Sequence, residues 1–307
     1  MTKMIDIILS TYNGEKYLTE QIDSIVNQEY KNWNLLIRDD GSTDSTIQII
    51  NKYEKKFPGN ITLINDQEGN LGPALSFYKL LDWSAAPYVA FCDQDDIWDQ
   101  SKLVNGLNML GNHPRDIPLL YFSNVQCINE YGEVKGTPKI PKRISFENAV
   151  VENVVYGCTI IINRTARDLL LAKKPTKLLM HDWWIYLVVT AFGEVIFDNC
   201  PNIKYRLHSD NTVGLQKNNL IKNLRKIFPF INSLANENAL RVTDQLKEFL
   251  DCYQSQLTIE KINYVNDMLE SKENIFKRIK LIKHGKCVRN SFWDSVALCA
   301  QVLIGKY

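Results

Sequence analysis

The feature that most constrains the fold is a regular alternation of short apolar runs and amphipathic helical patterns in the first hundred residues. Four runs read as buried strands because they are short, apolar and bounded by turn residues, at 5–9, 34–38, 61–64 and 87–92. Between them, apolar residues recur every three or four positions, which predicts helices around 18–26, 47–53 and 75–81. The alternation predicts an α/β fold built on a doubly wound, mostly parallel sheet.

Polar side chains follow three of these strands at the point where each strand ends. They are Ser10–Asn13, Asp39–Asp40 and Asp93–Asp96. Parallel strands end at one edge of a sheet, so these clusters should meet in one crevice. Clustered carboxylates repel one another unless a cation or abundant water is present, and oxygen ligands suit Mg²⁺ or Mn²⁺, which commonly accompany phosphates. The alternative is a solvated turn in which Asp96 caps a helix starting near Ile97.

The composition sets limits on location and partners. A net charge of +1 provides no field to attract nucleic acid, so we expect no such partner. No apolar run reaches the roughly 18 residues needed to span a bilayer, and no export signal precedes the first strand. The seven cysteines are scattered without a CxxC pair and the four histidines are dispersed. We therefore expect a reducing, cytoplasmic location and no zinc site.

Six segments, in their order and spacing, resemble the family 2 glycosyltransferases of the GT-A fold. They are Ile8–Asn13, Arg38–Asp44, Cys92–Trp98, Gly157–Thr159, His181–Trp184 and Tyr205–His208. The ensemble is most similar to bacterial rhamnosyltransferases of cell-surface polysaccharide pathways. The resemblance covers roughly residues 4–215. It implies a Rossmann-like GT-A catalytic domain, a nucleotide-sugar donor and transfer with inversion.

The resemblance also implies which residues bind the nucleotide. The family's acid at Asp39 accepts a hydrogen bond from the N3–H of uracil or thymine; the alternative is that Asp39 caps the following helix. Ser10 and Tyr12 match residues that line the nucleotide pocket, with Tyr12 stacking on the base. Asn13 belongs either to this pocket or to the turn that it forms with Gly14.

A second group of residues is expected to hold Mg²⁺ or Mn²⁺ and the diphosphate. Asp95 is the expected metal ligand, and Asp93 binds the ribose or the metal's water shell. His208 matches a histidine that completes the metal shell or touches the diphosphate, and Arg206 is expected to bind the phosphates. The ion would neutralise charge that develops on the leaving group. Asp96 either supports the ligands or caps a helix.

Asp182 is the expected general base. A transferase that inverts at the anomeric carbon needs one carboxylate opposite the leaving group to deprotonate the acceptor hydroxyl. His181–Asp182 should open a helix, where the dipole stabilises the carboxylate anion. The alternative is that Asp182 only caps this helix. Many members of the family carry Glu-Asp here, and His181 is a variation associated with the rhamnosyl branch.

The C-terminal third has a different pattern. Strand signals cease near residue 220, so we expect a catalytic domain over 1–218 and a helical region over 219–307, with breaks at Pro229 and Asn236–Asn238. Lysines and arginines alternate with apolar residues over 272–289, and apolar residues continue over 291–304. Such a segment can lie on an anionic membrane. The alternatives are a helical cap on the catalytic domain and a homo-oligomer interface.

Together these features predict a metal-dependent inverting glycosyltransferase. The expected donor is dTDP-rhamnose and the expected acceptor is a lipid-linked or growing surface polysaccharide, reached at the inner face of the cell membrane. One alternative is an enzyme of the same family that uses a UDP-hexose. Another is a scaffold that binds nucleotide sugars without catalysis.

Overall fold

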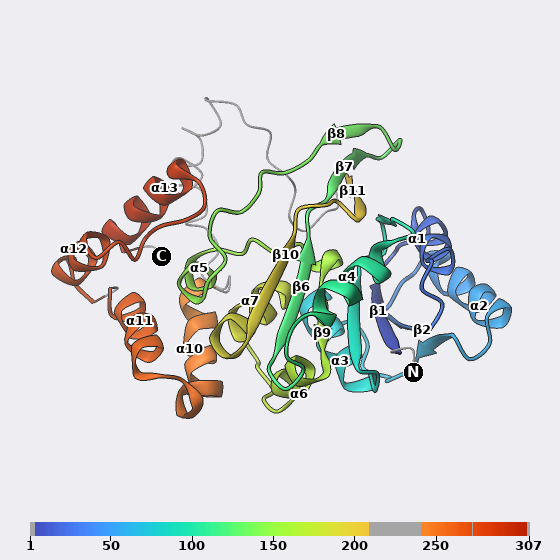
Figure 1. Ribbon diagram of the computed structural model, residues 1–307, viewed down its shortest axis with the longest axis horizontal. Helices are drawn as coiled ribbons and strands as arrows, with labels where there is room; N and C mark the ends of the chain where they lie inside the picture. Colours follow the sequence, from blue (N-terminus) through green and yellow to red (C-terminus); the bar gives the residue numbers. More distant parts are fainter. Residues whose placement is uncertain (1–3, 209–240, 272, 306–307) are drawn as a thin grey trace. The chain divides into compact units, whose positions relative to one another are not determined.

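The computed structural model describes residues 4–208, 241–271 and 273–305 (Figure 1). These residues form two compact units. The first contains residues 4–140, 155–173 and 180–208, and the second contains 141–154, 174–179 and the described residues from 241 onward. The predicted boundary between 218 and 219, and the breaks expected at Pro229 and Asn236–Asn238, lie outside the described residues.

The first unit is built on a seven-stranded sheet with the order β10-β6-β9-β4-β1-β2-β3. Its strands are β1 (Ile5–Thr11), β2 (Trp33–Asp39), β3 (Ile61–Ile64), β4 (Tyr88–Cys92), β6 (Leu119–Ser123), β9 (Ile161–Asn163) and β10 (Glu194–Asp198). Neighbours pair in parallel except at β9, which runs antiparallel to both β4 and β6. The predicted mostly parallel sheet is confirmed.

The register brings the three polar strand ends to one edge. Thr11 at the end of β1 lies opposite Asp39 at the end of β2, and Leu9 lies opposite Cys92 at the end of β4. Each of these strands is buried over most of its length, and Ile7 of β1, Ile37 of β2 and Ala90 of β4 have no exposed surface. The polar residues that follow therefore emerge from a rigid support.

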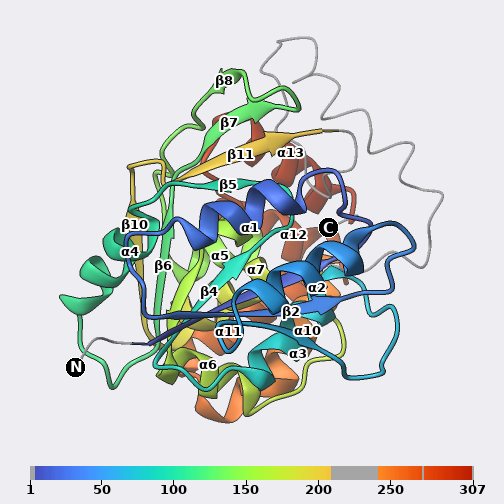
Figure 2. The same cartoon turned by 90° about the vertical axis from the view of Figure 1, so that its right-hand side faces the viewer.

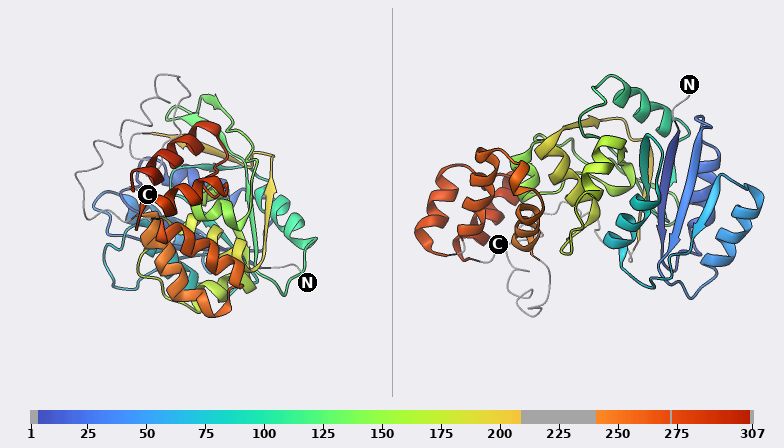
Figure 3. Two further views of the ribbon diagram at one scale, coloured as in Figure 1. Left: turned by 90° about the vertical axis from the view of Figure 1, so that its left-hand side faces the viewer. Right: turned by 90° about the horizontal axis from the view of Figure 1, so that it is seen from below.

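Helices cover both faces of this sheet (Figure 3). They are α1 (Leu18–Val26), α2 (Thr46–Lys56), α3 (Pro73–Trp83), α4 (Lys102–Gly111), α6 (Arg164–Leu171) and α7 (His181–Phe192). Helices α3, α6 and α7 pack together, and α1 packs with α2. The predicted helices are confirmed because each presents an apolar stripe to the sheet.

The acidic loop, residues 93–96, follows β4 and leads into a second, four-stranded sheet, of which Figure 2 shows β5, β11 and β7 side by side. Its strands are β5 (Ile97–Trp98), β7 (Gln126–Asn129), β8 (Val134–Gly136) and β11 (Ile203–Leu207). The alternative that a helix starts near Ile97 is wrong. Ile97 and Trp98 instead pair antiparallel with β11, and helix α4 begins at Lys102.

The second unit is helical. It comprises α5 (Phe146–Val151), α10 (Val242–Tyr253), the 3₁₀ turn η3 (Gln254–Gln256), α11 (Ile259–Glu270), α12 (Ile275–Lys283) and α13 (Phe292–Leu303). Phe146 stacks against Phe249, so α5 joins the C-terminal helices although it lies far from them in sequence. Of the basic segment predicted over 272–289, the described residues 273–289 are helical within α12, and the chain turns at Gly285, whose φ is +67°. Across the described ranges, no helix has the length and apolarity to cross a membrane.

Candidate functional site

The side chain of Gln94 joins the end of β1 to the acidic loop. Its Oε1 accepts a hydrogen bond from Tyr12 N at 2.9 Å, and its Nε2 donates to Tyr12 O at 3.1 Å. A Cβ atom at Gly14 would lie 2.4 Å from Gln94 Oε1, so this close approach requires glycine. Sequence reasoning assigned Gln94 no role, because its hydrogen-bond partner is the backbone of a residue 82 positions away.

Asn13 forms the turn that the sequence left as one of two possibilities. Its φ is +48°, its backbone N donates to Ser42 Oγ at 2.8 Å, and its Oδ1 accepts from Thr43 N at 2.8 Å. These bonds tie the loop after β1 to the loop after β2. Ser10 is partly buried beside them, whereas Tyr12 is 51% exposed and presents a ring at the edge of the sheet.

The carboxylate of Asp39 holds its own loop. Its Oδ1 accepts from Thr11 Oγ1 at 2.9 Å and from Ser42 Oγ at 2.5 Å. Its Oδ2 accepts from the backbone N of Ser42 at 2.8 Å and of Gly41 at 3.1 Å. Both oxygens are thus engaged by the protein, and a nucleotide base that binds Asp39 has to exchange with one of these donors.

A buried ion pair beneath this loop was not anticipated from the sequence. Arg38 and Asp40 are both almost fully buried, with Nη1 and Oδ1 2.5 Å apart. Asp66 binds the guanidinium from the other side at 2.7 Å. Asp40 also accepts from the backbone N of Leu71 and of Gly72. The second acid of the Asp-Asp pair is therefore structural, and it anchors the start of α3.

The acidic loop and the turn at Cys158 bring three possible ligand groups, two carboxylates and one thiol, into one small volume. One carboxylate oxygen each from Asp93 and Asp96, and the thiol of Cys158, lie within 4.8 Å of one another. Burial, and after it the charge of Asp95, raises the pKa of Asp96 to about 7. Burial also raises the pKa of Asp93 well above its ordinary value, helped by the charges of Asp96, Asp95 and Asp182. A proton or a cation has to compensate this cluster.

Two predicted metal ligands touch one another. His208 Nε2 lies 2.6 Å from Asp95 Oδ2, and both side chains are mostly buried. Strand β11 carries His208 to the acidic loop through its pairing with β5. Carboxylate oxygens with one imidazole form a donor set that fits Mg²⁺ or Mn²⁺. The residues of the acidic loop and His208 therefore fit the expected ion.

Arg206 is engaged by the protein rather than directed outward. Its backbone N donates to Asp96 Oδ1 at 2.9 Å, and its Nε donates to Asp95 O at 2.9 Å. Its Nη2 forms an ion pair with Glu20 at 2.5 Å, and the guanidinium lies 4.5 Å from the ring centre of Tyr17. These contacts favour a role in shaping the acidic loop over the phosphate contact expected from the sequence.

Asp182 lies in the first turn of α7, as expected. Its Oδ1 accepts from Trp183 N at 2.6 Å, and its charge contributes to the raised pKa of Asp93, so the two carboxylates are neighbours. The 3₁₀ turn η1 (Gly157–Thr159) lies against this helix start, because a Cβ at Gly157 would be 3.5 Å from Asp182 Cβ. Asp182, Asp93 and Cys158 thus belong to one site.

A buried lysine behind the acidic loop was also missed. Lys102 has no exposed surface, and its Nζ lies 3.8 Å from the ring centre of Trp98. Burial lowers the pKa of Lys102 to about 8. Trp98 is itself buried and belongs to the core. Nothing in the neighbouring sequence marked Lys102 as buried.

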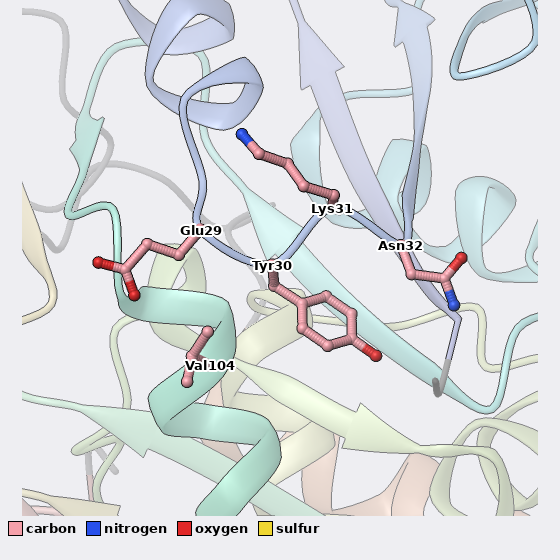
Figure 4. Close-up of a pocket in the computed structure, with 5 residues that line it drawn as sticks. All are labelled: Glu29, Tyr30, Lys31, Asn32 and Val104. Atoms are coloured by element: carbon pink, nitrogen blue, oxygen red, sulfur yellow. The ribbon is translucent and has the colours of Figure 1, made fainter. Parts of the chain in front are cut away.

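The hollow in Figure 4 is not part of this site. It is lined by Glu29, Tyr30, Lys31, Asn32 and Val104. Residues 29–32 form the loop before β2, whereas the acidic loop follows the carboxyl end of β4. The hollow therefore lies at the opposite ends of the parallel strands.

Comparison with known proteins shows that the chain belongs to glycosyl transferase family 2. The family model for glycosyl transferase family 2 matches residues 6–166, which is more than half of the chain. A dTDP-rhamnosyl transferase, RfbG of Shigella flexneri, is 29% identical over 216 residues, covering 67% of this chain and 73% of RfbG. The β-1,3-glucosyltransferase WfgD of Escherichia coli, which uses UDP-Glc and acts on GlcNAc-diphosphoundecaprenol, is 28% identical over 70% of this chain and 81% of WfgD.

Solved structures show the same fold. A fragment of S. aureus TarS in complex with UDP-GlcNAc has a TM-score of 0.57 and 18% identity, covering 99% of this chain and 93% of the fragment. The mannosyltransferase PcManGT from Pyrobaculum calidifontis, in complex with GDP-Man and Mn²⁺, has a TM-score of 0.51 and 14% identity, covering 100% and 89% of the two chains. The expected GT-A fold with C-terminal helices is confirmed.

Proposed function

Because the chain belongs to glycosyl transferase family 2 and acts in surface polysaccharide synthesis, we propose that it transfers rhamnose from dTDP-rhamnose with inversion. The proposed acceptor is a lipid-linked or growing polysaccharide. The donor is supported by the similarity to RfbG, a dTDP-rhamnosyl transferase, since the match covers 73% of RfbG. The acceptor class is supported by WfgD, whose acceptor is a diphosphoundecaprenol-linked sugar.

The observation that carries the proposal is the grouping of acids at one sheet edge. Asp93, Asp95 and Asp96 lie beside Asp182, and His208 contacts Asp95. An isolated cluster of this kind is electrostatically unfavourable, as the raised pKa values of Asp93 and Asp96 indicate. A divalent ion and a diphosphate would offset that repulsion.

Each residue has a distinct part in the proposed reaction. Asp95, Asp93 and His208 would hold Mg²⁺ or Mn²⁺, which would supply charge neutralisation for the departing nucleoside diphosphate. Tyr12 would stack on the base, and Ser10 and Asp39 would line its pocket. Asp182 would take the proton from the acceptor hydroxyl as that oxygen attacks the anomeric carbon. Arg206 would keep the acidic loop in place.

The test is thermal stabilisation by nucleotides and nucleotide sugars with Mn²⁺ or Mg²⁺. We expect dTDP and dTDP-rhamnose to stabilise the protein in a metal-dependent way, and more than UDP, UDP-glucose or UDP-GlcNAc. A stronger stabilisation by UDP-sugars would show that the donor is a UDP-sugar, as it is for WfgD. Absence of any nucleotide response would contradict both the enzyme and the scaffold, since each of them binds a nucleotide sugar.

Turnover separates the enzyme from the scaffold. We expect Asp182→Asn to keep donor and metal binding, because it preserves shape, and to lose turnover by orders of magnitude, because the amide accepts no proton. Asp168→Asn on α6 is a matched control, since Asp168 is exposed and its ion-pair partner among the described residues is the neighbouring Arg167. Unchanged turnover in Asp182→Asn would remove Asp182 as the base.

We further propose that the second unit attaches the enzyme to the inner face of the cell membrane. Helices α12 and α13 contact one another, since Arg278 Nη1 donates to Leu303 O at 3.1 Å. These helices and the residue that follows α13 expose large apolar side chains, namely Ile275, Phe276, Ile279, Phe292, Trp293, Val296, Leu303 and Ile304. Lys280 and Lys283 lie exposed on α12, which suits anionic lipid.

A further inference from the structure

His181 is a buried aromatic residue at the start of α7, immediately before the proposed base. Its side chain is 3% exposed. The imidazole centre lies 4.0 Å from the ring centre of Phe77 on α3 and 5.7 Å from that of Phe91 on β4. The planes of His181 and Phe91 are almost parallel, at 9°. The ring therefore fills a place in the core between two elements.

Both nitrogens of this imidazole lack a hydrogen-bond partner among the described residues. Burial lowers the pKa of His181 to about 3, so the ring is neutral at pH 7. A buried polar group without a partner costs free energy, and packing has to offset that cost. The contacts of His181 are thus those of an aromatic hydrocarbon, not those of a proton carrier.

The third wall around His181 is the turn η1. A Cβ atom at Gly157 would lie 3.0 Å from His181 Nε2, which is tighter than ordinary packing. The glycine backbone therefore rests directly on the imidazole edge. The same Cβ would lie 3.5 Å from Asp182 Cβ, so the position of the imidazole and the position of Asp182 depend on one packed contact.

We propose that His181 is a positioning residue for Asp182, acting as a neutral wedge between Phe77, Phe91 and Gly157. The wedge sets the position of the first turn of α7 relative to the acidic loop, since Phe91 belongs to β4 and lies two residues before Asp93. The shape of the ring carries this function, and its nitrogens do not. The proposal rests on the proposed role of Asp182 as the general base.

The test compares variants that keep or remove the wedge. His181→Phe retains a planar ring, and we expect its kcat to stay within about threefold of the wild type. His181→Ala empties the space, and we expect kcat to fall by about tenfold to a hundredfold, the range produced by a misplaced catalytic group. The KM for the donor should stay the same in both, because the nucleotide pocket is not touched.

Gly157→Ala provides a second, independent disturbance of the same contact. Its Cβ should push the imidazole and lower kcat in the same way. In the double variant Gly157→Ala/His181→Ala the added methyl has room, so the loss should be clearly smaller than the product of the two single losses. If His181→Ala alone fails to fold, Gly157→Ala on its own still tests the contact.

Two outcomes would overturn the proposal. One is a kcat of His181→Phe as low as that of His181→Ala, which would assign the function to the nitrogens. The other is an unchanged kcat in folded His181→Ala or Gly157→Ala, which would leave His181 as ordinary core. Failure of the proposed base is recognised separately, because Asp182→Asn would then retain turnover whatever the result at His181.

Discussion

At the residue scale, single side chains join loops that the sheet only brings near one another. Gln94 is the clearest case. Its two hydrogen bonds to the backbone of Tyr12 connect the acidic loop to the residue whose ring is proposed to stack on the base. The amide of Gln94 bonds both the N–H and the C=O of Tyr12, as the backbone of a neighbouring strand would. Recognition of base and of metal should therefore depend on each other through this residue.

Replacing Gln94 should weaken both the fold and nucleotide binding. Gln94→Ala removes two hydrogen bonds, which should lower the free energy of unfolding by about 1–3 kcal/mol. Urea unfolding measures the first effect and nucleotide titration the second. Gln100→Ala, at an exposed glutamine six residues on, serves as control and should change neither. Wild-type nucleotide affinity in Gln94→Ala would show that the connection has no part in binding.

His181 should make the protein sensitive to acid. Its folded pKa of about 3 lies below the ordinary 6.5, so the unfolded chain binds the proton first. Stability is therefore complete above pH 6.5 and falls by about 1.4 kcal/mol per pH unit as the pH drops toward 3. His181→Phe should lack this loss. Urea unfolding at pH 7, 6 and 5 measures it, and equal slopes for both proteins would contradict the expectation.

The opposite pH dependence expected from the acidic loop cancels in this comparison. The pKa of Asp96 is raised to about 7, so the folded chain binds that proton first, and its contribution weakens as the pH rises from about 4 to 7. Asp96 is present in both proteins. The difference between them isolates the imidazole.

At the element scale, strand β11 decides whether the metal ligands meet. It carries His208 to Asp95 and its own backbone binds Asp96. Asp95→Asn should weaken Mn²⁺ binding by roughly tenfold or more, because it removes a charged oxygen ligand. The measurement is the thermal shift on titration with Mn²⁺ and dTDP. Asp116→Asn, at an exposed acid before β6, should leave the titration unchanged.

An unaltered Mn²⁺ midpoint in Asp95→Asn would move the primary ligand elsewhere. Asp93 and Asp96 would then be the remaining carboxylates, because one oxygen of each already lies near the other. The same titration in Asp93→Asn distinguishes these possibilities. His208→Ala should show a smaller shift than Asp95→Asn, since it removes a neutral ligand.

The elements of the first hundred residues were predictable, and those that assemble the site were less so. Strands β1 to β4 and helices α1 to α3 follow local periodicity. Strand β5 does not, because two residues after a run of acids become a strand only by pairing with β11, far along the chain. Helix α5 joined the second unit for the same reason, through the contact of Phe146 with Phe249.

The residues of the candidate site also fall into two groups, those that local sequence predicts and those that depend on tertiary contacts. Asp39, Asp93, Asp95, Asp182 and His208 could be named from sequence, because each follows a strand or opens a helix within a recognisable segment. Gln94, Lys102 and the Arg38–Asp40 pair could not. Their roles depend on backbone or rings brought close by the tertiary fold, and nothing in the neighbouring sequence marks those partners.

At the scale of the whole molecule, the proposed membrane surface can be tested by introducing one negative charge into it. Phe276 on α12 is 80% exposed, and so is Tyr131 in the turn between β7 and β8. Phe276→Glu should reduce flotation with anionic liposomes several-fold, because it places a carboxylate in the apolar surface. Tyr131→Glu is the matched control and should float like the wild type.

Light scattering without lipid separates the membrane from a second copy of the chain. A monomer that floats with anionic liposomes supports the proposal. A dimer that Phe276→Glu dissociates would instead make the exposed face of α12 and α13 an oligomer interface. Failure of the wild type to float even at low salt would exclude the membrane as its partner.

The antiparallel strand β9 has a consequence for how the chain can be made. Strands β1 to β4 come from the first 92 residues, but β6 and β10 join them only through β9, which begins at Ile161. During synthesis, therefore, one side of β4 has no neighbour until about seventy further residues have been added. Its backbone is then an open edge of the kind that recruits other chains. A nascent chain arrested before Ile161 should aggregate, whereas one released after Asp198 has the partners to close its sheet.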